Sequence, residues 1–222
     1  RHSERSHVGL HAEAQDGVVH GCGSRLYGKS ATDGVNRMRD KGGEAIADPR
    51  LTSLDSPSLT DGCGYALFDA EGTATDKLAL INQGNLASLI HNSATAAYFD
   101  THSTVHASRG PKSTLGVGVH QLEILAGTDG DSSLKAGTYL ELVNLTGLHS
   151  GANPLSGNFS FGASGYLCKD GIRGQAIRGI TVAGNFFDML NKIAAIGDAP
   201  VWDWEHSSLM PSIRFSDLAI SG

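Results

Sequence analysis

Alternation of apolar and polar residues predicts β-strands along most of this chain. A period of two, which is typical of strands with one buried face, occurs in residues 5–15, 116–125, 139–145 and 213–220. Residues 77–81 and 86–90 flank an Asn-Gln-Gly-Asn turn and predict a hairpin. Further strands are expected at 48–54 and, after the Asp170-Gly171 turn, at 179–182. Strands joined by such short turns predict a mainly antiparallel sheet.

Three short segments have the features of helices instead. Residues 92–99 form one candidate, starting near Ser93, and residues 35–47 form a weaker one because of Gly42 and Gly43. The third has Asn185 as its N-cap and is expected to close at Gly197; its apolar stripe is Phe186, Phe187, Leu190 and Ile193. The predicted fold class is α+β, a predominantly antiparallel β-sheet domain with a few short helices.

The composition supports a turn-rich β protein and argues against nucleic-acid and membrane partners. The chain has 222 residues with 29 glycines, and only 18% of its residues are charged. A formal charge of −6 without any Lys/Arg run argues against binding nucleic acid. No apolar run reaches the length of a membrane span and no signal peptide is recognisable, so we expect no membrane partner. Three widely spaced cysteines are typical of a reducing compartment and predict a cytoplasmic protein.

The densest run of small residues lies between Asn144 and Cys168. It reads NLTGLHSGANPLSGNFSFGASGYLC, a Gly/Ser/Asn/Pro cluster followed by strand-like alternation. The simplest interpretation is a tight loop between two strands. Small residues also let a backbone approach a ligand or another chain closely, so a binding role stays open.

The run GLHSGANPLSGNFSFGASGYLCKDG resembles the signature of the TldD/PmbA family, and specifically of its PmbA (TldE) branch. The likeness continues through residues 180–185, 188–190 and 196–198, and His106-Ala107-Ser108-Arg109 resembles the family's His-Ala-x-Arg segment. It covers roughly residues 36–222. The resemblance implies that residues 35–222 form the family's C-terminal domain and that residues 1–34 are a partial junction and strand segment. We expect the family's N-terminal α/β domain to be missing from this sequence. The link near Ser30 is short relative to other members, either because the protein is shortened or because the sequence omits a stretch.

Several histidines and carboxylates invite a metal or acid/base interpretation. His7, His11 and Glu13 would share one face of a strand, and His102 and His106 have the i,i+4 spacing of helical ligands. A solvated strand face and a loop are the preferred interpretations, because β-branched residues and Gly110-Pro111 disfavour a helix around His106. Asp69 and Glu71 form a carboxylate pair, for which a solvated turn is preferred.

The catalytic TldD branch, which the resemblance brings in for comparison, is similar to a zinc peptidase. It uses a helical His-Glu-x-x-x-His motif and a cysteine in a segment near the C-terminus. This chain has no His-Glu pair, and residues 201–211, which stand in place of that segment, contain no cysteine. We therefore expect no catalytic residue, no metal ligand and no cofactor in this chain, with zinc in the partner subunit.

The resemblance thus implies the non-zinc subunit of a TldD/TldE-type heterodimeric metallopeptidase, which degrades or trims unstructured peptides, including leader peptides. Its partners would be a TldD-like subunit and a peptide substrate, and the chain would have no peptidase activity alone. The residues that we expect to line the peptide channel are His149, Ser150, Gly151, Asn153, Ser156 and Gly157. Trp202 and Trp204 are candidate anchors at the partner interface, with ordinary core burial as the alternative.

Two other classes of function stay open. The first is a non-enzymatic protein-interaction regulator, in line with the family's older association with DNA gyrase. Its acidic balance would make it act through protein contacts. The second is an autonomous metalloenzyme built from His7, His11, His102 and His106, which metal analysis would reveal.

Overall fold

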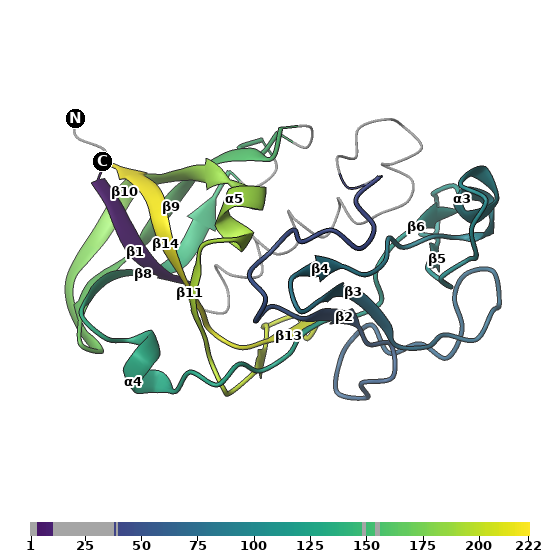
Figure 1. The fold of residues 1–222 in the computed structure, drawn as a ribbon, viewed down its shortest axis with the longest axis horizontal. Helices are drawn as coiled ribbons and strands as arrows, with labels where there is room; N and C mark the ends of the chain where they lie inside the picture. Colours follow the sequence, from purple (N-terminus) through teal and green to yellow (C-terminus); the bar gives the residue numbers. More distant parts are fainter. Residues whose placement is uncertain (1–3, 11–37, 39, 148–149, 154–155) are drawn as a thin grey trace.

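The computed structural model describes residues 4–10, 38, 40–147, 150–153 and 156–222 (Figure 1). Within these residues the chain forms two large sheets, mainly antiparallel, and three short helices. The predicted α+β class, dominated by antiparallel sheet, is confirmed. No helix among the described residues is long and apolar enough to cross a membrane.

The first sheet closes on itself into a small barrel. β1 pairs with β8 on one side and with β14 on the other, which closes the ring β1-β8-β9-β10-β14. The short β11 pairs with the first part of β14, where β10 does not reach. Only the β1–β8 pair is parallel. The strands are β1 (Glu4–Leu10), β8 (Thr138–Thr146), β9 (Asn158–Lys169), β10 (Ile172–Asn185), β11 (Ile193–Ile196) and β14 (Ile213–Ser221).

The β9–β10 hairpin dominates the barrel, and its turn is the one that Asp-Gly predicts. Asp170 and Gly171 have φ of 48° and 81°, as both central residues of a type I′ turn require. Along the first part of β9, Phe159, Phe161 and Ala163 are buried and alternate with less buried residues. The strand therefore has one face in the barrel core and one face outside.

The second sheet has the order β12-β13-β7-β2-β3-β4 and lies beside the barrel (Figure 1). Its strands are β2 (Ser53–Asp55), β3 (Leu78–Asn82), β4 (Asn85–Leu86), β7 (Leu122–Ile124), β12 (Val201–Trp202) and β13 (Ser208–Met210). Beyond it lie the two-stranded sheet of β5 (Ala107–Ser108) and β6 (Gly116–Val117), and the helix α3 (Ser93–Tyr98). The predicted hairpin at 77–90 is confirmed as β3 and β4.

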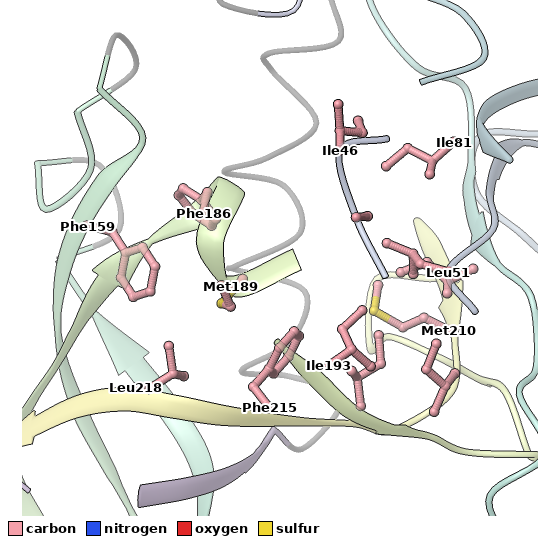
Figure 2. Packing of buried hydrophobic residues seen from close by; sticks show 14 of the residues in the cluster. Ile46, Leu51, Ile81, Phe159, Phe186, Met189, Ile193, Met210, Phe215 and Leu218 are labelled. Atoms are coloured by element: carbon pink, nitrogen blue, oxygen red, sulfur yellow. The ribbon is translucent and has the colours of Figure 1, made fainter. Parts of the chain in front are cut away.

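One hydrophobic cluster joins the two sheets (Figure 2). On the barrel side, Phe159 stacks on Phe161 with ring centroids 5.1 Å apart, and Phe186 lies 4.9 Å from Phe159. On the other side, the same cluster continues through Leu51 and Met210. Apolar burial on this scale is the main source of stability, so we expect the two sheets to unfold together.

Two predicted helix starts are confirmed by their caps. Asn92 caps α3 in a capping box with Thr95, and the Asn185 side chain accepts a hydrogen bond from Phe187 N at the start of α5 (Phe186–Leu190). The third helix, α4 (Asp131–Leu134), was not among the predicted elements.

Other local predictions were wrong. Residues 40–47 form turns and no helix, since Gly42 and Gly43 favour turns. The segment after Asn185 is helical only to Leu190, and residues 193–196 leave it to pair with β14 as β11. Residues 48–52 precede the strand β2 and do not belong to it. Backbone pairing with a distant strand overrode local propensity in the case of β11.

The N-terminal strand takes part in the barrel. β1 lies before residue 35, and its backbone pairs with β8 and β14. The division at residues 34 and 35 stays a prediction. His11 and Glu13 lie outside the described residues, and no side chain of β1 is described.

Candidate functional site

The first part of the signature run forms a compact corner between β8 and β9, which we name the signature corner (described residues 147, 150–153 and 156–158). Gly151 N donates to Gly147 O over 2.7 Å, and Gly157 N donates to Asn153 O over 3.0 Å. The Asn153 side chain accepts from Ser156 N over 3.0 Å. These bonds close successive turns, so the small residues are used first of all to build the loop.

Glycine is required at two points of the signature corner. Gly157 has φ of 80°, and a Cβ there would lie 2.6 Å from the Phe187 ring. A Cβ on Gly151 would lie 2.3 Å from the carbonyl oxygen of Ser160. The corner therefore packs tightly on α5 and on β9, which no residue with a side chain would allow.

The predicted channel residues do not all face solvent. Ser150 and Asn153 are exposed, Gly151 and Ser156 are half-buried, and Gly157 is buried. His149 lies outside the described residues. Of the predicted channel residues that the structure describes, Ser150 and Asn153 are thus the exposed ones.

The two tryptophans differ in their surroundings. Trp202, on β12, is half-buried and its ring stacks on His206 with centroids 5.6 Å apart. Trp204 is 74% exposed in the turn before β13. This exposure excludes the alternative interpretation, burial in the core, for Trp204.

A second group of residues, which we name the buried cluster, consists of Asp55, His106 and His120. Asp55 ends β2, His106 precedes β5, and His120 lies between β6 and β7. His106 Nε2 lies 3.0 Å and His120 Nδ1 2.8 Å from the same oxygen, Oδ2 of Asp55. The side chains of Asp55 and His106 are 0% and 1% exposed, and that of His120 is 11% exposed.

The other oxygen of Asp55 organises the backbone. Its Oδ1 accepts hydrogen bonds of 2.9 Å from the backbone N–H groups of both His120 and Gln121. This explains why residues 116–125 do not form the single predicted strand: the segment bends around the carboxylate at 118–121, between β6 and β7. The Gln121 side chain then fixes the loop after Asp55 by donating to the carbonyl oxygens of Ser56 and Leu59.

The electrostatics of the buried cluster favour an ionised Asp55. Burial by itself would raise the pKa of this carboxyl, but the adjacent imidazoles of His106 and His120 and the N–H of Gln121 lower the pKa to about 2. The pKa of nearby His91 is lowered by its burial and by His106. The cluster therefore contains a fixed negative charge surrounded by donors.

Of this cluster, sequence reasoning considered only His106 as a candidate ligand, together with His102, and it preferred a loop for this segment; residues 102–106 do lie outside any helix or strand. His102 is exposed and does not belong to the cluster. Asp69 and Glu71 stand at a turn, as preferred, and Glu71 is exposed. Asp69, however, is buried: its Oδ1 accepts from Glu71 N and Thr73 N and its Oδ2 from Ala107 N. The only sequence signal for a special role of His120 was its place in the alternation: it is a polar residue on the same predicted strand face as the apolar Leu122 and Ile124.

The zinc site of the catalytic TldD branch does not fit this chain. Residues 201–211 form the turn of the β12–β13 hairpin, in which Asp203 is buried and accepts from both Ser207 and Ser208. His206 directs Nδ1 to the carbonyl oxygen of Asp61 over 3.0 Å. These side chains are used within the turn, and the segment has no cysteine.

The fold, a closed barrel fused to a second sheet with the signature corner between β8 and β9, defines the class of C-terminal metallopeptidase domains. A family model described as the PmbA/TldA metallopeptidase C-terminal domain matches residues 3–222. The chain belongs to this PmbA/TldD family, as its resemblance to the family indicated.

Individual relatives agree with the PmbA (TldE) branch. The chain is 30% identical over 187 residues to the metalloprotease PmbA of Escherichia coli O157:H7, covering 82% of this chain and 39% of that protein. It is 28% identical over 205 residues to a PmbA homologue of Haemophilus influenzae, covering 90% and 41%. The chain therefore spans about two fifths of the length of these relatives.

Solved structures show the same fold. TldE from Thermococcus kodakarensis superimposes with a TM-score of 0.87 at 22% identity, covering all of this chain and 51% of that one. A Thermotoga maritima protein described as a candidate modulator of a DNA gyrase superimposes with a TM-score of 0.89 at 23% identity, covering all of this chain and 50% of that one.

Proposed function

We propose that this chain belongs to the non-zinc subunit of a TldD/TldE-type heterodimeric metallopeptidase that degrades or trims unstructured peptides, leader peptides among them. Family membership and the PmbA-named relatives support the class. The observation that carries the subunit assignment is the segment 201–211, which stands in place of a zinc-binding cysteine segment and contains no cysteine. The zinc would then come from a TldD-like partner, in the cytoplasm, and this chain would need no cofactor for its role.

Handling of unstructured peptides is supported by a free strand edge. β14 pairs with β10 only from Thr181 to Ala183, and among the described residues no strand pairs with the outer side of Ile172–Gly179. An extended peptide can add to such an edge through its backbone, whatever its side chains are. Register shifts after Arg173 and Ile177 restrict this addition to a few residues at a time.

The signature corner would guide the peptide on the same barrel. It lies at the far end of the β9–β10 hairpin from the Asp170-Gly171 turn, and it presents Ser150 and Asn153 to solvent. Hydroxyl and amide groups can bond to a peptide backbone without reading its sequence. This suits a subunit that positions varied peptides for a catalytic neighbour.

The proposal is tested by hydrolysis of an unstructured peptide by the full-length protein, by a TldD-like subunit, and by both together. We expect cleavage only by the mixture. Cleavage by this protein alone, removed by a chelator, would overturn the proposal and favour the autonomous metalloenzyme.

Surface variants refine the test. Ser150→Ala combined with Asn153→Ala should raise the KM for the peptide in the mixture, whereas Ser132→Ala, an exposed serine of α4, should leave it unchanged. Trp204→Ala should weaken binding to the partner about tenfold or more if Trp204 is an anchor. Tyr98→Ala, another exposed aromatic residue, is its control.

An interaction regulator without peptidase activity is the second candidate. The exposed side chains of Tyr65, Leu67 and Phe68, 46% to 65% accessible on one loop, favour contact with another protein. Affinity purification distinguishes the two: recovery of a TldD-like subunit supports the first proposal, and recovery of a topoisomerase without it supports the second.

A further inference from the structure

The buried cluster brings three potential metal ligands together from three separate segments. One ligand atom from each of Asp55, His106 and His120 lies within 4.8 Å of the other two. In the part of the chain that the structure describes, these are the only residues grouped in this way. Asp55 precedes His106 by 51 positions and His120 by 65 positions in the sequence.

The orientation of His106 is that of a metal-ligating imidazole. Its Nδ1 faces the carbonyl oxygen of Thr104 at 2.5 Å, and because a carbonyl can only accept, Nδ1 carries a proton. Its Nε2 is thereby directed at Asp55. Metal-binding histidines commonly donate their second ring N–H to a backbone carbonyl in this way, which fixes the tautomer.

The Nε2 atom of His106 is also not satisfied by its neighbours. Although it lies 3.0 Å from Oδ2 of Asp55, the pair lacks the alignment of a hydrogen bond, and this buried nitrogen has no other hydrogen-bond partner. A buried polar atom without a well-formed bond is uncommon and calls for a physical reason. An ion placed between Nε2 and Oδ2 would supply one.

We propose that Asp55, His106 and His120 bind one divalent metal ion, with zinc as the best match. Two neutral imidazoles and one carboxylate are borderline ligands with a total charge of −1, a set that suits zinc. His106 would bind through Nε2, His120 through Nδ1 and Asp55 through Oδ2. Binding requires the Nε2–H tautomer of His120: Nδ1 releases its proton to solvent and, where the ring starts as the neutral Nδ1–H form, Nε2 takes one up, so the imidazole stays neutral. Any proton on Nε2 of His106 passes to solvent.

The role of this ion is structural. Both oxygens of Asp55 are used, since Oδ1 is bonded to two backbone N–H groups, and no further carboxylate joins the cluster among the described residues. The site thus has no free base to activate a water molecule, as hydrolysis requires. The ion would instead join the end of β2 to the segments before β5 and β7, and its fourth ligand position would open beside the partly exposed His120.

The full-length protein, freed of metal by a chelator and kept without its proposed partner, provides the test. Zn²⁺ titration by calorimetry should show one site, and Co²⁺ should give the visible spectrum of a four-coordinate ion. His106→Gln and His120→Asn keep a side-chain amide near the ligand nitrogen and can still donate to Asp55, so they should fold but bind zinc at least about tenfold more weakly. His102→Gln, which changes an exposed histidine four positions away, should bind as the wild type does.

NMR of the histidine ring nitrogens supplies a readout that needs no variant. On adding Zn²⁺, the signals of His106 and His120 should shift while that of His102 stays. Absence of zinc binding by the wild type would overturn the proposal. So would equal binding by the wild type, His106→Gln and His120→Asn, or loss of binding only in His7→Gln or His11→Gln. Because binding is measured without peptide or partner, this result is independent of the proposed peptidase role.

Discussion

The signature corner and the buried cluster are built in opposite ways. The corner closes within about a dozen residues, through bonds such as Gly151 N to Gly147 O, and its polar side chains remain at the surface. In the cluster, Asp55 bonds to backbone and side-chain atoms of His120, 65 positions away, and the carboxylate is shielded from water. Because its contacts are local, the corner can be predicted from the sequence. The cluster forms only when distant segments meet in the complete fold.

The two regions should also differ in how substitutions change the stability of the protein. The corner depends on backbone conformation and close packing, so changes there should be tolerated in graded steps. The cluster depends on one carboxylate that accepts hydrogen bonds from three donors, and removal of that carboxylate leaves these buried donors without a partner. The predictions below start from the cluster and end with a more exposed carboxylate.

Asp55→Ala should have the largest effect. The His120 imidazole and two backbone N–H groups lose their acceptor, and each buried donor left unpaired typically costs about 1–3 kcal/mol. Urea unfolding of the metal-free protein measures the loss. Asp198→Ala, at an exposed position, should change stability by less than about 0.5 kcal/mol. Similar stability of the two variants would show that the cluster contributes nothing to the apo fold.

The sequence was informative wherever one segment contains the whole signal. The helix start near Ser93, the cap Asn185, the Asp170-Gly171 turn and the alternation in β8 and β14 each depend on neighbouring residues, and each was predicted correctly. The signature run similarly placed the corner before a strand.

Predictions failed where distant segments decide. Residues 193–196 carry an apolar pattern that suits a helix, but pairing with β14 makes them a strand. Residues 116–125 alternate as one strand, but the carboxylate of Asp55 breaks them in two. The buried cluster was missed for the same reason: spacing along the chain suggested only the disfavoured pair of His102 and His106 and could not reveal Asp55 or His120.

Gly157→Ala should have the second largest effect and tests whether the corner is set by packing or by backbone conformation. Gly147 and Gly157 both have φ of 80°, but a Cβ on Gly147 meets nothing within 4 Å, whereas one on Gly157 lies 2.6 Å from Phe187. Gly147→Ala should therefore cost about 1–2 kcal/mol of backbone strain alone. Gly157→Ala should cost a further 1–3 kcal/mol or so of overpacking, measured by thermal unfolding. Equal losses would mean that the Phe187 contact does not constrain the corner.

Asn185 allows the corner and the helix to be separated. Its side-chain oxygen caps α5 at Phe187 N, and its Nδ2 donates 2.8 Å bonds to Ser156 O and to the side chain of Asn158. Asn185→Ala should cost about 1–2 kcal/mol because it loses both functions. Asn185→Asp keeps the cap of α5 but places a carboxylate oxygen against two other acceptors, Ser156 O and the Asn158 side-chain oxygen. Backbone NMR chemical shifts should therefore change in the corner and not in α5. Loss of α5 signals in Asn185→Asp would contradict this division.

Glu123 is the half-exposed counterpart of Asp55 and should show the smallest effect. Burial tends to raise the pKa of its carboxyl, but a bond from Ser56 Oγ and the 2.9 Å pair with Lys77 lower the pKa overall. A carboxyl whose pKa is lower in the folded state stabilises the protein above its unfolded pKa, near 4.3, and loses that contribution as the pH falls through the folded pKa. The wild type should therefore lose more stability than Glu123→Gln between pH 5 and the folded pKa, by no more than about 1 kcal/mol. If Glu123→Gln instead lowers the free energy of unfolding at pH 7 as much as Asp55→Ala does, then burial is not what distinguishes Asp55 from Glu123. The number of donors to each carboxylate would then have to explain the contrast between them.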